Sequence, residues 1–162
     1  MTGGVGLFDP VVGKIQYMLS DKHPDLKSYM VVHALYPWDK HSFVALGNNG
    51  IYCYDVQNDR TWIPEELKRN GAAYTKYFCM LKDRHGLFWF GTEDGIFILD
   101  RKKKICLQLT ESDGLPNNAV TAILEDNTGV IWASTLNGLC KIECKKNNSD
   151  LKYLVTAYGC LL

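Results

Sequence analysis

Apolar positions along this chain gather in short segments, and turns rich in Gly, Asn and Asp separate them. In one stretch the segments are Tyr77–Leu81, Leu87–Phe90, the residues after Gly95, and Ile105–Leu109. Short segments bounded by turn residues predict antiparallel strands joined by hairpins. Many segments are apolar at consecutive positions, which indicates sheets covered on both faces and not sheets with one face in water. No apolar stripe with a helical period appears.

The segments repeat. The glycine that opens one of the apolar strands recurs at intervals of 44, 45 and 43 residues, at Gly6, Gly50, Gly95 and Gly138. Asn or Asp precedes three of these glycines, a pair that predicts a type I′ hairpin turn. A second landmark, Asp-x-x-Gly, occurs at Asp83 and Asp126, with Asp39 at the corresponding place one unit earlier. Asp at the first and Gly at the fourth position are typical of a type I turn.

A period of this length with four strands per unit predicts an all-β fold, a β-propeller made of four-stranded antiparallel blades. The units predict about three and a half blades of a larger array: 1–20 as the end of one blade, 28–67, 74–110 and 117–157 as blades, and 158–162 as the start of the next linker or blade. Propellers close with four to eight blades. We therefore expect a fragment of a longer chain, unless several copies complete one ring.

The unit that starts at Gly114 carries a family resemblance. It reads Gly-Leu-Pro-Asn-Asn-Ala-Val, then Glu-Asp-Asn-Thr-Gly-Val-Ile-Trp, then Ser-Thr-Leu-Asn-Gly-Leu, and it resembles the two-component regulator propeller repeat. The unit from Tyr77 to Asp100 shares its Asp, Trp and Gly landmarks. The unit from Tyr29 to Asp55 is degenerate and has Val44 in place of the tryptophan.

In that family, arrays of these repeats form the periplasmic sensory region of bacterial hybrid two-component histidine kinases. The resemblance implies a non-catalytic, periplasmic ligand-sensing segment without cofactors, which recognises a carbohydrate-derived ligand such as an oligosaccharide and self-associates through the dimer of the parent receptor. A protein-interaction scaffold without a small-molecule ligand is the alternative. A propeller lyase would need clustered His, Arg or acidic residues, which the sequence does not show.

The composition of the chain limits the classes of partner that we expect. Lys plus Arg and Asp plus Glu each number 18, so the formal net charge is zero, which argues against nucleic acid or direct membrane contact as partners. No apolar run is long enough to span a bilayer, and the N-terminus does not resemble a signal peptide. The six cysteines show no zinc-ligand spacing and favour buried thiols over disulfides, without fixing the compartment.

The sequence predicts no catalytic, cofactor-binding or metal-binding residue, and it leaves the ligand-binding residues unknown. Because the Asp residues recur at one turn position, we expect them to cap turns and not to act as catalytic acids. Because the Trp residues recur in register, we expect them to pack in the core and not to stack on sugars. The basic segment Arg101–Lys104 favours a solvated hairpin over a polyanion patch. Non-repeating segments are the better candidates for ligand contact, although structural roles are favoured for their aromatic residues too: Tyr36–Trp38, Trp62–Pro64 and Asn70–Lys76.

Overall fold

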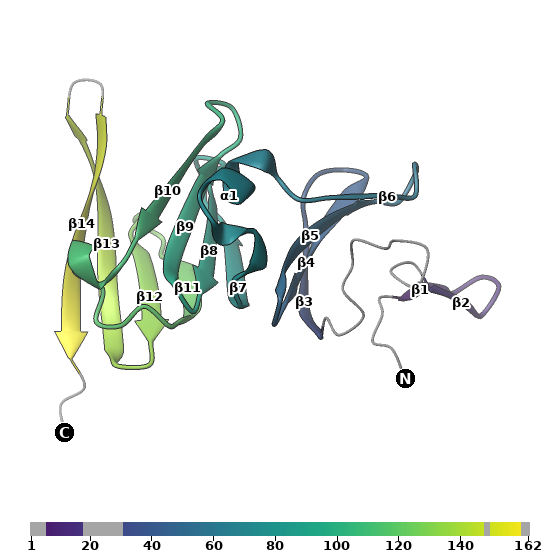
Figure 1. The fold of residues 1–162 in the computed structure, drawn as a ribbon, viewed down its shortest axis with the longest axis horizontal. Helices are drawn as coiled ribbons and strands as arrows, with labels where there is room; N and C mark the ends of the chain where they lie inside the picture. The colour runs from purple at the N-terminus through teal and green to yellow at the C-terminus, as the bar shows by residue number, and fades with distance from the viewer. Residues whose placement is uncertain (1–5, 18–30, 148–149, 160–162) are drawn as a thin grey trace.

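The computed structural model describes residues 6–17, 31–147 and 150–159. In these residues the chain forms three four-stranded antiparallel sheets, which are the blades of a propeller segment, and one separate hairpin (Figure 1). The hairpin consists of β1 (Gly6–Asp9) and β2 (Lys14–Tyr17). The all-β prediction and the four-stranded units are confirmed, and every sheet is a simple meander in chain order.

Each blade contains four consecutive strands. The first blade is β3 (Val32–Pro37), β4 (Ser42–Gly47), β5 (Gly50–Asp55) and β6 (Arg60–Trp62). The second is β7 (Tyr77–Lys82), β8 (Phe88–Thr92), β9 (Gly95–Asp100) and β10 (Ile105–Leu109). The third is β11 (Val120–Glu125), β12 (Ile131–Thr135), β13 (Gly138–Asn147) and β14 (Asp150–Gly159).

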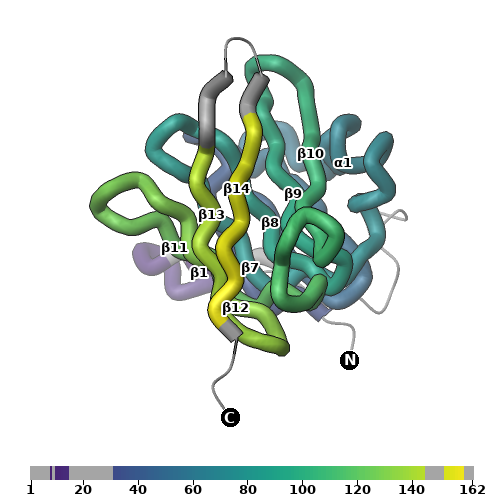
Figure 2. Tube along the Cα trace, turned by 90° about the vertical axis from the view of Figure 1, so that its left-hand side faces the viewer, coloured from purple at the N-terminus to yellow at the C-terminus, as the bar shows by residue number. Residues whose placement is uncertain are grey.

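The blades stack face to face, and the core lies between them. Figure 2 looks onto the third blade, with β13 and β14 nearest the viewer and the other blades behind. One apolar layer joins the first and second blades and includes Val44, Ile51, Phe90 and Leu99. A second layer joins the second and third blades and includes Trp89, Ile98, Cys140 and Ile142. Stacking explains why the strands are apolar at consecutive positions, because both faces of the second blade are covered.

The hairpin turns before Gly50, Gly95 and Gly138 differ from the type I′ prediction. A type I′ turn requires positive φ at both central residues, and Asp94 is not among the described residues with positive φ. Thr92 and Gly95 are paired across this turn, so the glycine is the first residue of β9 and not a central turn residue. Its φ of +112° and its close approach to the Leu109 carbonyl explain why glycine recurs here, since a Cβ would lie 2.2 Å from that oxygen.

The last hairpin is longer than the sequence predicts. The polar residues from Lys145 to Asp150 indicate a turn, but β13 continues to Asn147 and β14 begins at Asp150. The antiparallel ladder between these strands runs from Gly138 with Gly159 to Asn147 with Asp150. Backbone pairing needs no apolar side chain, so a polar sequence continued the ladder. β14 also passes the expected blade end at residue 157.

Short helices connect the blades. The helix α1 (Glu65–Arg69) and the 3₁₀ turn η1 (Ala72–Tyr74) follow the first blade, and a second 3₁₀ turn, η2 (Glu111–Asp113), follows the second. The buried Leu67 anchors α1 in the layer between the first two blades. One helical turn is too short to produce a periodic pattern, so the sequence did not predict α1. No helix in the described ranges is long and apolar enough to cross a membrane.

Candidate functional site

The Asp-x-x-Gly turns confirm the turn-capping prediction and add a tryptophan to it. In the second blade the backbone N–H of Gly86 donates to the Asp83 carbonyl at 2.9 Å, which closes the type I turn. The Asp83 carboxylate accepts from the N–H groups of His85 and Leu87, and also from the indole N–H of Trp89 at 2.9 Å. Asp83 is only 7% exposed. Its acceptors are therefore engaged in structure, which argues against a catalytic role.

The third blade repeats this arrangement. Asp126 accepts from the backbone N–H groups of Thr128 and Val130, from the Thr128 hydroxyl, and from the indole of Trp132 at 2.9 Å. Hydrogen bonds from Thr128 and Trp132 hold the pKa of this carboxyl well below its ordinary value. Trp89 is buried between blades as predicted, whereas Trp132 is half-buried and stacks on Tyr158. Core packing is thus confirmed for Trp89 and only partly realised for Trp132.

The first blade departs from the pattern at one turn. The Trp38 N–H donates to the Ser42 carbonyl at 2.9 Å, the bond that Asp83 makes with Leu87 in the second blade. Trp38, and not Asp39, therefore occupies the position of the repeated aspartate, which corrects the alignment by one residue. Asp39 still caps its own turn, because its carboxylate accepts from the His41 N–H at 3.2 Å.

The partner of the repeated aspartate is missing from the first blade as well. Gly47 pairs with Gly50 as Thr92 pairs with Gly95, so Val44 lies where the other blades have tryptophan. The substitution recognised in the sequence is confirmed by this register. With a Trp at the aspartate position and a Val at the tryptophan position, this described blade cannot form the Asp–Trp hydrogen bond. The side chains of its turn can therefore make other contacts.

Trp38 contacts Arg101 of the second blade. The side chain is 3% exposed, and its ring stacks on Phe88 with centroids 4.6 Å apart. The Arg101 guanidinium lies over the Trp38 ring at 4.5 Å and donates to the Trp38 carbonyl at 3.3 Å. Arg101 also lies 3.7 Å from the Asp39 carboxylate. These contacts fix the turns of two neighbouring blades relative to each other.

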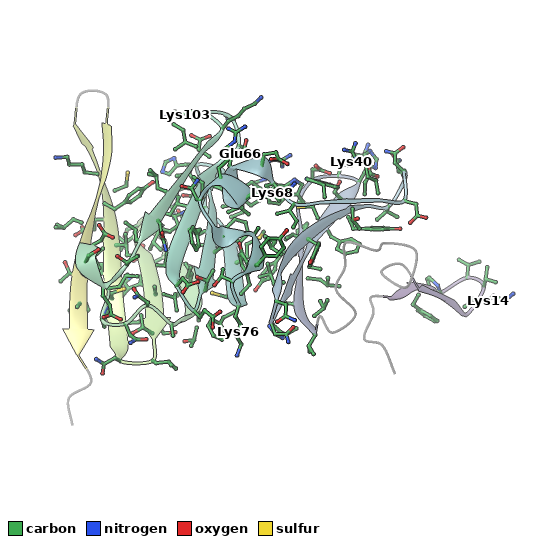
Figure 3. All side chains as sticks on the ribbon, viewed as in Figure 1. Lys14, Lys40, Glu66, Lys68, Lys76 and Lys103 are labelled. Atoms are coloured by element: carbon green, nitrogen blue, oxygen red, sulfur yellow. The ribbon has the colours of Figure 1, made fainter. Side chains whose placement is uncertain are left out.

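These turns border a cleft of about 1010 Å³ between the first and second blades. The first blade contributes Trp38, Tyr52, Arg60, Thr61 and Trp62; the connection contributes Ile63, Pro64, Glu65, Glu66, Lys68, Arg69 and Tyr74; and the second blade contributes Leu99, Arg101 and Lys104. In Figure 3, Glu66 and Lys68 lie at the helix between the first and second blades. Lys40 and Lys103 lie toward the top of the view, and Lys76 lies toward the bottom. We call this space the inter-blade cleft.

The structure brings together parts of all three non-repeating segments. Trp38, residues 62–64 and Tyr74 all line the inter-blade cleft. Tyr36 does not line it; this half-buried side chain packs against the core layer of the first two blades. The basic segment divides: Lys102 and Lys103 are exposed on a hairpin capped by Asp100, as predicted, whereas Arg101 and Lys104 line the cleft.

Other candidates remain outside any site. His41 and His85 are exposed on equivalent turns, and His23 lies outside the described residues. Ser112 and Asp113 belong to the η2 linker, where Asp113 caps Thr110. Among the residues that the structure describes, no group of three His, Cys, Asp or Glu side chains could hold a metal ion.

The cysteines within the described ranges are free thiols, in agreement with the sequence. Cys53, Cys106 and Cys140 are buried, Cys79 is half-buried and Cys144 is exposed, whereas Cys160 lies outside the described residues. Burial raises the pKa of Cys106 to about 12 and the pKa values of Cys79 and Cys140 to about 11. Thiols with raised pKa values are poor nucleophiles, so these three residues are structural.

Comparison of folds finds similar chains among solved structures. Two crystal structures of the extracellular domain of BT4673 from B. thetaiotaomicron, described once as a one component system and once as a hybrid two component system, each match with a TM-score of 0.68 and 16% sequence identity. They are matched over 90% of this chain and 20% or 19% of theirs. The extracellular domain of BT3049, a hybrid two component system from the same organism, matches with a TM-score of 0.56 and 17% identity, over 93% of this chain and 22% of that one.

The chain thus spans about a fifth of the length of the solved structures that it matches, and the similarity establishes the propeller fold. No curated protein sequence matches this chain. The two component regulator propeller family matches residues 114–137, which contain the Asp126 turn and its tryptophan. Three stacked four-stranded blades and this match agree: the chain is a propeller segment in which residues 114–137 match the two component regulator propeller repeat.

Proposed function

We propose that this chain is a ligand-sensing segment of the periplasmic propeller of a hybrid two-component sensor kinase. The observation that carries the proposal is the two component regulator propeller repeat at residues 114–137. The fold similarity to extracellular domains of such systems supports the same placement. Because fold alone does not define function, the proposal depends on the repeat type together with a site.

The segment itself is non-catalytic in this proposal, and its ligand is carbohydrate-derived. Support comes from the inter-blade cleft, where aromatic residues meet cationic side chains. Sugar rings stack on aromatic faces, and charged groups fix their orientation. Binding would favour one arrangement of the propellers in a dimeric parent receptor and bias the kinase across the membrane by a population shift.

A protein-interaction scaffold is the second candidate, and one observation favours it. The outer face of the third blade exposes Leu124, Leu139, Leu154 and Tyr158. Exposed large apolar side chains that share one face of a sheet are typical of a protein contact. A scaffold would use this face and would have no small-molecule ligand.

The experiment starts from the gene. We expect the reading frame that encodes this chain to encode a membrane helix and a histidine kinase as well. That complete receptor, in membrane vesicles with labelled ATP, should change its autophosphorylation at least several-fold when oligosaccharides from partial polysaccharide hydrolysis are added. A reading frame without a kinase, or a receptor indifferent to every oligosaccharide, would contradict the proposal. Stable capture of a protein partner through the outer face of the third blade would then support the scaffold.

A further inference from the structure

We propose that the inter-blade cleft binds an acidic oligosaccharide, that is, a sugar chain bearing carboxylate or sulfate groups. This inference rests on the proposed function, since it specifies the ligand of a carbohydrate sensor, and it assigns the site to the cleft between the first and second blades.

The size of the cleft indicates an oligomer. Ligand pockets for small molecules measure about 300 to 1,000 Å³, and the inter-blade cleft is at the top of that range with about 1010 Å³. Two of its aromatic side chains are accessible: Tyr74 is 65% exposed and Trp62 is half-buried. Two accessible aromatic side chains on a cleft of this size suit an oligomer of sugar rings better than one ring.

The charge of the cleft indicates an acidic ligand. Its lining contains five cationic side chains and two acidic ones: Arg60, Lys68, Arg69, Arg101 and Lys104 against Glu65 and Glu66. The whole chain has a formal net charge of zero. Positive charge therefore exceeds negative charge in the lining of the cleft, and such an excess attracts ligands of the opposite sign.

The existing ion pairs leave this excess in place. Lys68 pairs with Glu65 at 2.7 Å, and Arg101 is held by Trp38 and Asp39. Among the described residues, no ion pair or hydrogen bond from a side chain of Arg60, Arg69 or Lys104 is found. Their exposed heads can reach carboxylate or sulfate oxygens without breaking an existing contact, and arginine does so with two parallel N–H groups.

A single-stranded nucleic acid is the rival ligand, since it also combines aromatic stacking with backbone charge. Proteins that bind nucleic acids normally carry an excess of basic residues over the whole domain, and this chain has none. The acidic oligosaccharide is the better match, and an oligonucleotide serves as a probe that can overturn it.

The test measures binding of defined probes to the whole 162-residue chain by isothermal titration calorimetry, with far-UV circular dichroism to check the fold. The probes are a sulfated heparin tetrasaccharide, a trigalacturonate, an uncharged xylotetraose and a thymidine decanucleotide. We expect binding of at least one acidic saccharide at least tenfold tighter than that of xylotetraose. The two acidic probes distinguish sulfate from carboxylate recognition. Tighter binding of xylotetraose or of the oligonucleotide, or no binding of either acidic probe, would overturn the inference.

Matched variants locate the site. Arg60→Gln with Arg69→Gln removes two charges from the cleft, whereas Lys102→Gln with Lys103→Gln removes two charges from the adjacent hairpin outside it. We expect the first pair to weaken acidic-saccharide binding tenfold or more and the second to change it less than twofold. Tyr74→Ala, at an exposed side chain, should weaken it at least threefold. Equal losses in the two double variants would show non-specific attraction and overturn the assignment.

The outcomes separate this inference from the proposed function. If the complete receptor responds to an uncharged oligosaccharide and the cleft variants have no effect, the sensor proposal survives and the assignment of the cleft fails. If no saccharide alters the receptor, the proposed function itself fails.

Discussion

Within the second and third blades, one repeated interaction joins two residues of the same blade: a turn aspartate accepts the indole N–H of a tryptophan six residues later. Asp83 with Trp89 and Asp126 with Trp132 make this bond at 2.9 Å in both cases. The carboxylate thus joins the turn to the first half of the next strand. Removing it would leave several N–H donors without an acceptor, and buried donors without partners are strongly destabilising.

The first prediction compares two aspartates. Asp83→Ala should lower the free energy of unfolding by about 2 to 4 kcal/mol, because the Trp89 indole and two backbone N–H groups lose their acceptor in a buried place. Asp39→Ala, at an exposed residue with one such bond and an exposed ion pair with Arg101, should change it by less than about 1 kcal/mol. Urea unfolding followed by tryptophan fluorescence measures both. Equal effects would contradict the structural role of the Asp–Trp pair.

The second prediction concerns pH. The pKa of Asp126 is lower in the folded state than its ordinary value of 3.8. A lowered folded-state pKa contributes stability that is present above the unfolded-state value and is lost as the pH falls through the folded-state value. The urea midpoint should therefore decline as the pH falls below about 4. Asp126→Asn should be less stable at pH 6 and show a shallower decline. A parallel decline in both proteins would contradict this assignment.

At the scale of elements, the glycines set the distance between chain segments. At Gly95 the backbone of β9 lies so close to the end of β10 that no side chain fits. Gly91 permits a similar approach between blades, since its Cβ would lie 2.7 Å from the Val120 carbonyl of β11. Glycine at these two positions therefore allows close contact between elements, in addition to its role in turn geometry.

The third prediction separates contact from backbone conformation. Gly95→Ala and Gly86→Ala both place a Cβ at positive φ, but only the first meets another atom, the Leu109 carbonyl. We expect Gly86→Ala to destabilise by about 1 to 2 kcal/mol and Gly95→Ala by about 3 kcal/mol or more. Thermal unfolding by circular dichroism checks the order. A smaller effect at Gly95 would mean that β10 can move away without loss.

Most elements could be predicted from the sequence because each strand buries apolar residues of its own; Ile105–Leu109 was predicted with the bounds that β10 has. The extension of the last hairpin depended on backbone pairing, which leaves no apolar signature. The inter-blade cleft was beyond local pattern altogether. Trp38 and Arg101 are 63 residues apart and meet only because two blades stack, so their proximity is a property of packing and not of any segment.

At the scale of the whole molecule, the two faces of the third blade differ. Its inner face is buried against the second blade. On the outer face, Trp132 is half-buried, although its counterpart Trp89 in the second blade is covered. Leu139 and Leu154 are exposed on the same face as Trp132, as the strand register requires. The face that stacking covers in one blade is thus open in the next.

The fourth prediction follows from this face. The 162-residue chain should self-associate with increasing concentration, so that light scattering gives a mass above 18.4 kDa. Leu139→Lys with Leu154→Lys should shift the mass toward the monomer, because two charges then oppose burial of that face. Ile105→Lys with Leu107→Lys, at similarly exposed apolar residues of β10, is the control. A monomeric wild-type chain, or equal effects of both pairs, would contradict the prediction.

The exchange of the aspartate for Trp38 and of the tryptophan for Val44 has a consequence beyond this chain. In a duplicated architecture, a unit that keeps the internal Asp–Trp bond has its turn committed to holding the blade together. A unit that has lost the bond has a turn free to diverge, and here that turn borders the inter-blade cleft. In a longer array, the units least similar to the consensus repeat are therefore the first places to look for ligand specificity.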